Sequence, residues 1–285
     1  MLRLLAASPH RVVGVLTAGL GDCVPGERVW PPELVKDPAF AATVRAEGVD
    51  LLLNIHSLCV VHRDVLAAPR LGSFNLHPGP LPGYAGLNAP SWAIYQGERS
   101  HAVTLHWMDA GIDTGDIVAT AAIEITPADT GYTLSAKCVR AGVPLVAALL
   151  TAADAEPPCI GRVPQPAGVR RYFGRSAPHG GWVVWSEPAQ QIVDFVRAAD
   201  YSPFRSPWGH ARTRLPPDGR EIAIVTAGRT GRGTAGARAG TVGEPVGDEV
   251  LVAAADEWVR VRCVRLDGRQ VVPAAVLPAG ACLAT

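Results

Sequence analysis

The sequence predicts two domains: an α/β domain with a parallel sheet, followed by a smaller domain of short β-strands. The first prediction rests on apolar, strand-like runs that alternate with helical segments over residues 1–163. The second rests on short β-like runs, separated by Gly, Pro and Asp turns, over residues 181–285. Residues 164–180 are rich in proline and glycine, so we expect a linker there.

The first domain is expected to begin with a short β-branched strand and to end with a long helix. Strands are predicted over 11–17, 49–56, 73–77, 102–108 and 117–125, and helices over 38–47, 90–96 and 133–153. The run at 49–56 is continuously apolar, which is typical of a parallel strand covered on both faces. Asn88 is expected to cap the helix that begins at Pro90.

The second domain is expected to open with a helix that has Ser186 as its N-cap and Pro188 in its first turn. Short strands are predicted over 221–226, 240–242, 250–253, 258–264 and 271–276. The segment 227–240 contains only Gly, Arg, Thr and Ala and is predicted to be a mobile hairpin loop. This pattern is typical of a small barrel.

Composition excludes several classes of function. The formal net charge is zero, with 26 basic and 26 acidic residues, so nothing global points to nucleic acid or membranes. The six cysteines form no C-x-x-C pair, so neither a zinc site nor a disulfide framework is expected. No apolar run approaching 18 residues was found, and we expect a cytoplasmic protein.

Two segments carry the chemistry: Phe74–Gly86 (FNLHPGPLPGYAG) and Gly111–Asp116 (GIDTGD). Asn75 and His77 are two residues apart on a predicted strand, so both side chains point to the same face. An amide can stabilise an oxyanion, and an imidazole can move a proton near neutral pH. The carboxylate of Asp113 can orient His77 and raise its pKa. These groups suit acyl transfer to an amine through a tetrahedral intermediate.

Each of these groups has a structural alternative. A lone Asn-x-His at a strand end is usually structural, and Asp-Thr-Gly is usually a turn. Their joint presence, in this order, favours function. His56 ends a buried strand and is interpreted as a core or pocket-wall histidine rather than a catalyst. His106 lies in the middle of a strand beside Trp107 and is interpreted as structural.

The two segments closely resemble the formyltransferases that use N10-formyltetrahydrofolate, whose signature is Asn-x-His-Pro-x-x-Leu-Pro-x-Tyr-x-Gly followed by Asp-x-Gly. The second half more loosely resembles the C-terminal barrel of methionyl-tRNA formyltransferases. The resemblance implies a Rossmann-like catalytic domain, an OB-like barrel and catalytic roles for Asn75, His77 and Asp113. It implies N10-formyltetrahydrofolate as the formyl donor. Family members begin with a strand and a Gly-containing turn, whereas this chain is expected to begin near the end of the following helix.

The resemblance also implies contact residues. Those for the folate are Leu53, Asn54, Ile55, His56, Ser57, Leu81, Gly111, Ile112, Thr114, Gly115 and Asp116. Those for the acceptor are Pro78, Tyr84, Gly86 and Asn88. No metal ligand is expected.

The acceptor amine is the open question. Methionyl-tRNA formyltransferases carry a basic loop where this chain has Ala18–Arg28, with one arginine and two acids. Phosphate binding needs several cations, so tRNA is disfavoured, although the arginines of 170–175 argue the other way. We expect a small-molecule amine, an amino acid or a carrier-bound aminoacyl group in specialised metabolism, such as siderophore or peptide biosynthesis. The alternatives are a sugar-nucleotide formyltransferase, a formyltetrahydrofolate hydrolase and a non-catalytic binding protein; a homodimer is compatible with each.

Overall fold

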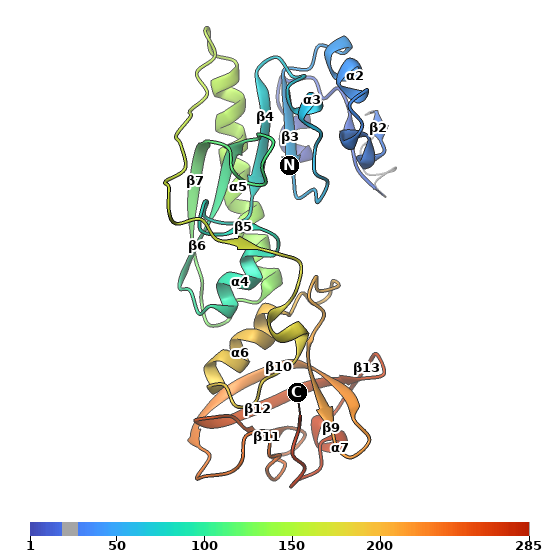
Figure 1. Cartoon of the computed structure of the whole chain (residues 1–285), viewed down its shortest axis with the longest axis vertical. Helices are drawn as coiled ribbons and strands as arrows, with labels where there is room; N and C mark the ends of the chain where they lie inside the picture. Colours follow the sequence, from blue (N-terminus) through green and yellow to red (C-terminus); the bar gives the residue numbers. More distant parts are fainter. Residues whose placement is uncertain (19–27, 285) are drawn as a thin grey trace. The chain divides into compact units, whose positions relative to one another are not determined.

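A computed structural model describes residues 1–18 and 28–284 of the chain (Figure 1). They form two compact units, which do not follow a single break in the sequence. The first unit contains Met1–Gly86, Ala102–Ile123 and Lys137–Tyr172, and the second contains Leu87–His101, Glu124–Ala136 and Phe173–Thr285. The tRNA-related loop discussed above falls almost entirely outside the described residues.

The elements of the first half match the predicted order. They are α1 (Leu2–Ala6), β1 (Val15–Leu16), β2 (Val29–Trp30), a 3-10 helix (Pro32–Lys36), α2 (Phe40–Ala46), β3 (Leu51–Ile55), α3 (Arg63–Leu66), β4 (Gly72–His77), β5 (Ala85–Gly86), α4 (Ala89–Tyr95), β6 (Ser100–Trp107), β7 (Ile117–Glu124) and α5 (Gly131–Ala153). The helices predicted from apolar periodicity at 38–47, 90–96 and 133–153 are confirmed as α2, α4 and α5. Asn88 does precede α4, but its side chain makes no capping hydrogen bond.

The central sheet has the strand order β3-β4-β6-β7 (Figure 1). The pair β3 and β4 is parallel, as predicted, with Leu51 opposite Gly72. The pair β4 and β6 is antiparallel, so the sheet is mixed and the expectation of parallel strands throughout was wrong at β6. Alternation reports which side of a strand is buried and does not report its direction.

Strand β3 departs from its prediction in a second way. All five of its residues are only half-buried, although its apolar run predicted coverage on both faces. The reason is position, because β3 is the edge strand of this sheet. A cavity of about 500 Å³ lies beside it, lined by the segments Val12–Thr17 and Leu51–Ile55 among others.

Helix α5 is the longest helix and packs on the sheet. Its side chains Leu134, Val146 and Leu149 are almost fully buried. Gly142 lies so close to β4 that a Cβ there would stand 2.6 Å from Leu76 Cδ2. In the described part of the chain, α5 alone is long and apolar enough to cross a membrane by length and composition, with a mean hydropathy of 1.5. The sequence predicts no such segment. The leucines and valines of α5 account for the value, and the helix also carries Lys137 and Arg140.

The second unit contains a five-stranded antiparallel sheet. The elements that follow α5 in the chain are β8 (Tyr172–Phe173), a 3-10 helix (Pro178–Gly181), α6 (Ala189–Ala198), β9 (Ala211–Leu215), β10 (Arg220–Gly233), β11 (Val250–Ala253), β12 (Glu257–Leu266), β13 (Arg269–Val271) and α7 (Pro273–Val276). The order is β11-β12-β10-β9, with β13 beside β12.

Single bridges close this sheet into a ring, as expected of a barrel. Arg214 of β9 pairs with Ala284, and Cys282 pairs with Thr241. Val242 then pairs with Val252 of β11, which returns to the first strand of the order. The apolar face of α6, including Ile192 and Phe195, belongs to the core of this ring.

Four predictions for the second unit need correction. The segment 227–240 is not a hairpin loop throughout, because β10 continues to Gly233. The segment 271–276 is a strand end followed by α7, which begins at Pro273. Strand β9 was not predicted, although its sequence ARTRL alternates arginine with buried residues, the period-two pattern of a half-buried strand.

The fourth correction concerns the start of α6. The residue at its N-cap is Pro188 rather than Ser186. A proline side chain cannot accept a hydrogen bond, and the free N–H of Ala189 instead donates to Oδ1 of Asp256 at 2.8 Å. A residue distant in sequence thus supplies the cap, which local pattern cannot reveal.

Candidate active site

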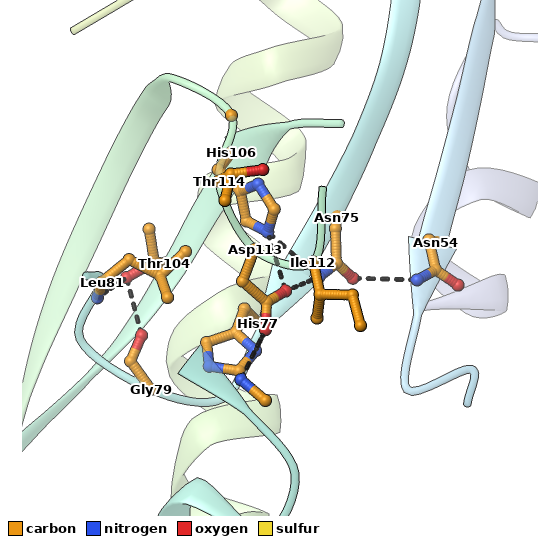
Figure 2. Close-up of polar contacts among 12 residues, drawn as sticks. Asn54, Asn75, His77, Gly79, Leu81, Thr104, His106, Ile112, Asp113 and Thr114 are labelled. Carbon is orange, nitrogen blue, oxygen red and sulfur yellow. Dashed lines mark hydrogen bonds and ion pairs between the residues drawn. The ribbon is translucent and has the colours of Figure 1, made fainter. Parts of the chain in front are cut away.

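The site is assembled across three neighbouring strands of the central sheet. The register places Asn75 of β4 opposite Asn54 of β3 on one side and opposite His106 of β6 on the other. The amide of Asn54 donates through Nδ2 to Asn75 Oδ1 at 3.1 Å. Asn75 and His77 share one face of β4, as their spacing predicts. The strands therefore align one row of polar side chains at the strand ends (Figure 2).

Asp113 lies at the centre of these side chains, on the loop between β6 and β7 (Figure 2). Its Oδ1 accepts from Asn75 Nδ2 at 3.2 Å and lies 3.5 Å from His106 Nε2. Its Oδ2 accepts from the backbone N–H of Gly86 at 2.8 Å and lies 3.5 Å from His77 Nδ1. Both oxygens of one buried carboxylate are thus surrounded by donors and imidazole rings.

The electrostatics of Asp113 follow from these partners. Burial acts to raise the pKa of Asp113, because it disfavours the charged form. The rings of His106 and His77, which favour the carboxylate when they are protonated, and the N–H of Gly86 outweigh it, so the pKa lies below its usual value. The carboxylate is therefore ionised at neutral pH, as the predicted role requires.

His77 is 3 % exposed and has a partner at each ring nitrogen. Its Nε2–H donates to the carbonyl of Tyr84 at 2.7 Å, and its Nδ1 faces Asp113. Burial lowers the pKa of His77, and the carboxylate of Asp113 and the carbonyl of Tyr84 only partly compensate. The neutral ring therefore predominates at pH 7, with its Nδ1 lone pair available to take a proton.

His106 is not among the residues that the sequence predicts for the site. The structure places this residue, 2 % exposed, against both Asn75 and Asp113, so any structural role it has lies inside the candidate site. The backbone carbonyl of Trp107 accepts a hydrogen bond from Nδ1–H of His106 at 2.6 Å. The neutral His106 ring therefore has its lone pair at Nε2. Nε2 lies 3.1 Å from Asn75 Nδ2, which therefore donates to it. The sequence feature that could have indicated this role is a second pair of polar residues two positions apart, Thr104 and His106. The register of their strand against β4, however, cannot be deduced from the sequence.

Of the residues expected to contact the folate, those of β3 lie beside the triad. Leu53, Asn54 and Ile55 are half-buried, and His56 and Ser57 after them are exposed. His56 is therefore not the core histidine that its strand-end position suggested. The cavity of about 500 Å³ is lined by four of these residues, all but His56.

The expected folate residues of the 111–116 loop differ in their surroundings. Gly111 N–H and Thr114 Oγ1 both donate to Oδ1 of Asp109, at 2.9 and 2.5 Å, and so shape the turn. Gly115 is buried where a Cβ would stand 2.0 Å from the carbonyl oxygen of Trp107, so only glycine fits. The side chain of Ile112 is 46 % exposed, as a ligand contact requires. The remaining residue, Asp116, lies 3.7 Å from Arg162 Nε.

The other expected contacts lie on the loop after β4. Leu81 is buried, and its N–H donates to Thr104 Oγ1 at 3.3 Å. Tyr84 and Gly86 support the triad directly through their backbone, while Pro78 is half-buried beside His77. The structure places Asn88, expected at the acceptor, at the start of α4. Within the described residues, no group of His, Cys, Asp and Glu is arranged to hold a metal ion.

Comparison with known sequences decides the family. Residues 7–149 match the formyl transferase family, and residues 175–281 match the formyl transferase C-terminal domain. The chain belongs to the formyltransferase family. It is 32% identical to a methionyl-tRNA formyltransferase of Symbiobacterium thermophilum, over 94% of this chain and 84% of that protein. It is 34% identical to one of Burkholderia multivorans, over 89% of this chain and 77% of that protein.

Solved structures agree on the fold of this formyltransferase. HypX from Aquifex aeolicus matches with a TM-score of 0.65 and 21% identity, over 88% of this chain and 42% of HypX. The N-formyltransferase from Helicobacter canadensis, solved with folinic acid and dTDP-3-aminofucose, matches with a TM-score of 0.56 and 19% identity. That match covers 73% of this chain and 72% of the other. The formyltransferase described here is accordingly an enzyme of folate-dependent formyl transfer, with N10-formyltetrahydrofolate as donor.

Proposed function

We propose that this formyltransferase moves a formyl group to the amine of a small molecule, an amino acid or a carrier-bound aminoacyl group in specialised metabolism. The observation that supports the transfer chemistry is the buried Asp113 carboxylate, held between the two imidazoles and the amide of Asn75. N10-formyltetrahydrofolate supplies the formyl group when bound. The residues beside the cavity at β3 suit such a ligand, since they combine apolar walls with few polar groups.

In this proposal His77 takes the proton that the attacking amine loses. Its neutral form is favoured by burial, and Asp113 stabilises the charged ring that results. Asn75 donates to the formyl oxygen as negative charge develops on it. In the structure both N–H groups of Asn75 are already committed, one to His106 and one to Asp113. Catalysis therefore requires that one of these bonds be exchanged for the formyl oxygen, while Asn54 continues to hold the amide in place.

The positions of the arginines bear on the identity of the acceptor. Residues 18–28 carry one arginine and two acids, a composition poorly suited to binding a polyanion. Arg170, which argued for tRNA, donates to the backbone carbonyls of Ile112 and Asp113 and so has a role inside the domain. Arg171 likewise donates to the carbonyl of Gly83. These contacts weaken the case for a phosphate site on the linker.

Methionyl-tRNA is the second candidate, and its support comes from the relatives. Both curated relatives described above are named methionyl-tRNA formyltransferases and match across both domains. A hydrolase is a weaker candidate, because it leaves the closed C-terminal sheet without a purpose. We retain the cytoplasm as the expected location.

The test is mass spectrometry of the purified protein with N10-formyltetrahydrofolate and a panel of amines. The panel contains amino acids, N-hydroxyornithine, aminoacyl carrier proteins, amino-sugar nucleotides and methionyl-tRNA. A formylated small or carrier-bound amine supports the proposal, whereas product on methionyl-tRNA alone overturns it. Steady formate release without an acceptor would identify a hydrolase. His77→Ala provides the inactive control, and it must remain folded by circular dichroism.

A further inference from the structure

Residues 165–171, here called the strap, contact both loops that carry the catalytic groups. We infer that the strap is a positioning element of the formyl-transfer centre, with Gln165 and Arg170 as the residues that fix Asp113. This inference rests on the proposed chemistry of Asp113 and His77. It is independent of which amine is the acceptor. All of its contacts lie within the first compact unit.

The first set of contacts holds the Asp113 loop by its backbone. Gln165 Nε2 donates to the carbonyls of Asp113 and Gly115, at 3.0 and 2.7 Å. Arg170 donates through its two terminal nitrogens to the carbonyls of Asp113 and Ile112, at 3.1 and 2.6 Å. Two strap side chains therefore bind three carbonyls around the catalytic carboxylate, and the carbonyl of Asp113 accepts from both.

These hydrogen bonds matter because Asp113 has an unfavourable backbone conformation. Its φ is +53°, in the left-handed region that residues other than glycine adopt rarely and at a cost. Such a conformation persists only where its surroundings impose it. Asp109 stabilises the turn from within, and the strap stabilises it from outside. Without the strap donors, relaxation of φ at Asp113 would turn its carboxylate away from His77.

The second set of contacts holds the loop after β4. The backbone N–H of Arg171 donates to the carbonyl of Pro82 at 3.2 Å, and its carbonyl accepts from Ala85 at 3.0 Å. Its guanidinium also lies 4.8 Å above the ring of Tyr84. Residues in this same stretch bind the triad, since Tyr84 accepts from His77 and Gly86 donates to Asp113. The strap thus connects the two loops between which the carboxylate and imidazole meet.

A positioning role predicts a specific kinetic effect. Gln165 and Arg170 contact backbone carbonyls of the Asp113 loop rather than the triad side chains. Their loss therefore alters the geometry of that loop, which also carries the expected folate contacts Ile112 and Gly115, and leaves the expected acceptor contacts on the loop after β4 in place. A displacement of about 1 Å at a reacting group can reduce rate by roughly 100-fold. We therefore expect Gln165→Ala and Arg170→Met each to lower kcat about 10- to 100-fold with little change in KM.

The controls separate positioning from charge and from folding. Arg175→Ala removes the same charge from an exposed residue close to the strap and should leave kcat unchanged. Arg170→Lys retains one charged donor and should recover part of the lost rate. Thermal unfolding of each variant checks that the fold is retained.

A second readout needs no substrate. The His77 ring is titrated by nuclear magnetic resonance in the free full-length protein, where Asp113, His106 and His56 are the titratable groups that act on it. Loss of the strap donors should lower the midpoint of the His77 titration, as Asp113→Asn should also do. The reason is that a displaced carboxylate stabilises the charged His77 ring less.

The outcomes are distinct. An unchanged His77 midpoint with unchanged kcat in the Gln165→Ala, Arg170→Met double variant would overturn the inference, whatever the acceptor proves to be. A shifted midpoint in folded protein supports the strap even if every amine in the panel fails, so the two proposals fail separately. An equal fall in kcat for Arg175→Ala would assign the effect to charge and reject positioning.

Discussion

At the scale of single residues, the site depends on one carboxylate with four partners. Asp113 contacts two imidazoles, one side-chain amide and one backbone N–H. Two partners are N–H donors, and the two rings favour the carboxylate when they are protonated, so the ionised form is favoured despite burial. His106 adds to this arrangement by holding the amide of Asn75.

The first prediction replaces that carboxylate by an amide of the same size. Asp113→Asn should lower kcat by about 10²–10⁴-fold, because His77 loses the group that stabilises its charged form. Steady-state kinetics on the acceptor identified by mass spectrometry provide the measurement. Asp64→Asn, an exposed acid on α3, is the matched control. Activity within threefold of wild type in Asp113→Asn would contradict the assigned role.

The second prediction concerns pH and follows from the direction of the His77 shift. The pKa of His77 is below the ordinary 6.5, because burial disfavours the charged ring. If His77 acts as the base, kcat/KM of the free enzyme should fall on the acidic side with an inflection below pH 6.5. The same shift affects the free energy of unfolding. Because His77 binds a proton more readily in the unfolded chain than in the folded protein, its contribution lowers stability as pH falls below 6.5. An acidic inflection above pH 7 would exclude His77 as the base.

At the scale of elements, register rather than local sequence brings the site together. One residue of slip between β4 and β6 would turn the side chains of one strand to the opposite face. Leu76, between the two catalytic residues of β4, points the other way and packs against α5 at Gly142. The helix therefore supports the strand from behind the site.

The third prediction tests that support. A side chain at position 142 must displace Leu76, which is almost fully buried, so Gly142→Val overpacks the interface. Overpacking costs about 1–3 kcal/mol, more than the fraction of a kcal/mol that valine gains over glycine as a helix former. Denaturant unfolding should show a net loss of about 1–2 kcal/mol. Val139→Ala, on an exposed part of α5, should change stability by less than about 0.5 kcal/mol.

At the scale of the whole molecule, the charge balance bears on the acceptor. The chain has a formal net charge of zero, and two of its linker arginines bind its own backbone. A surface of this kind gives little long-range attraction to a polyanion.

The fourth prediction follows from that balance. With a small amine acceptor, kcat/KM should change less than about twofold between 50 and 200 mM salt. An acceptor held through 6–10 phosphate contacts would lose roughly 10³–10⁵-fold in affinity over the same range. A salt series with the identified acceptor gives the answer, and a steep loss would favour tRNA.

The sequence by itself determined the family and most of the elements, and it predicted the three residues proposed for catalysis. The motif places Asn75 and His77 two residues apart on a strand, and a period of two is enough to put them on one face. Helical periodicity likewise located α2, α4 and α5. These features are local, so a single stretch of chain contains all the information they need.

Only the tertiary structure decided which distant groups meet. The antiparallel pairing of β4 and β6 brought His106 to Asn75, and the cap of α6 came from Asp256. The strap reached the Asp113 loop from more than 50 positions further along the chain. Each of these contacts joins segments that are far apart in sequence, and the physical reason is the same: a pattern records which side of an element is buried, whereas strand direction, register and long-range hydrogen bonds are set by how the elements pack.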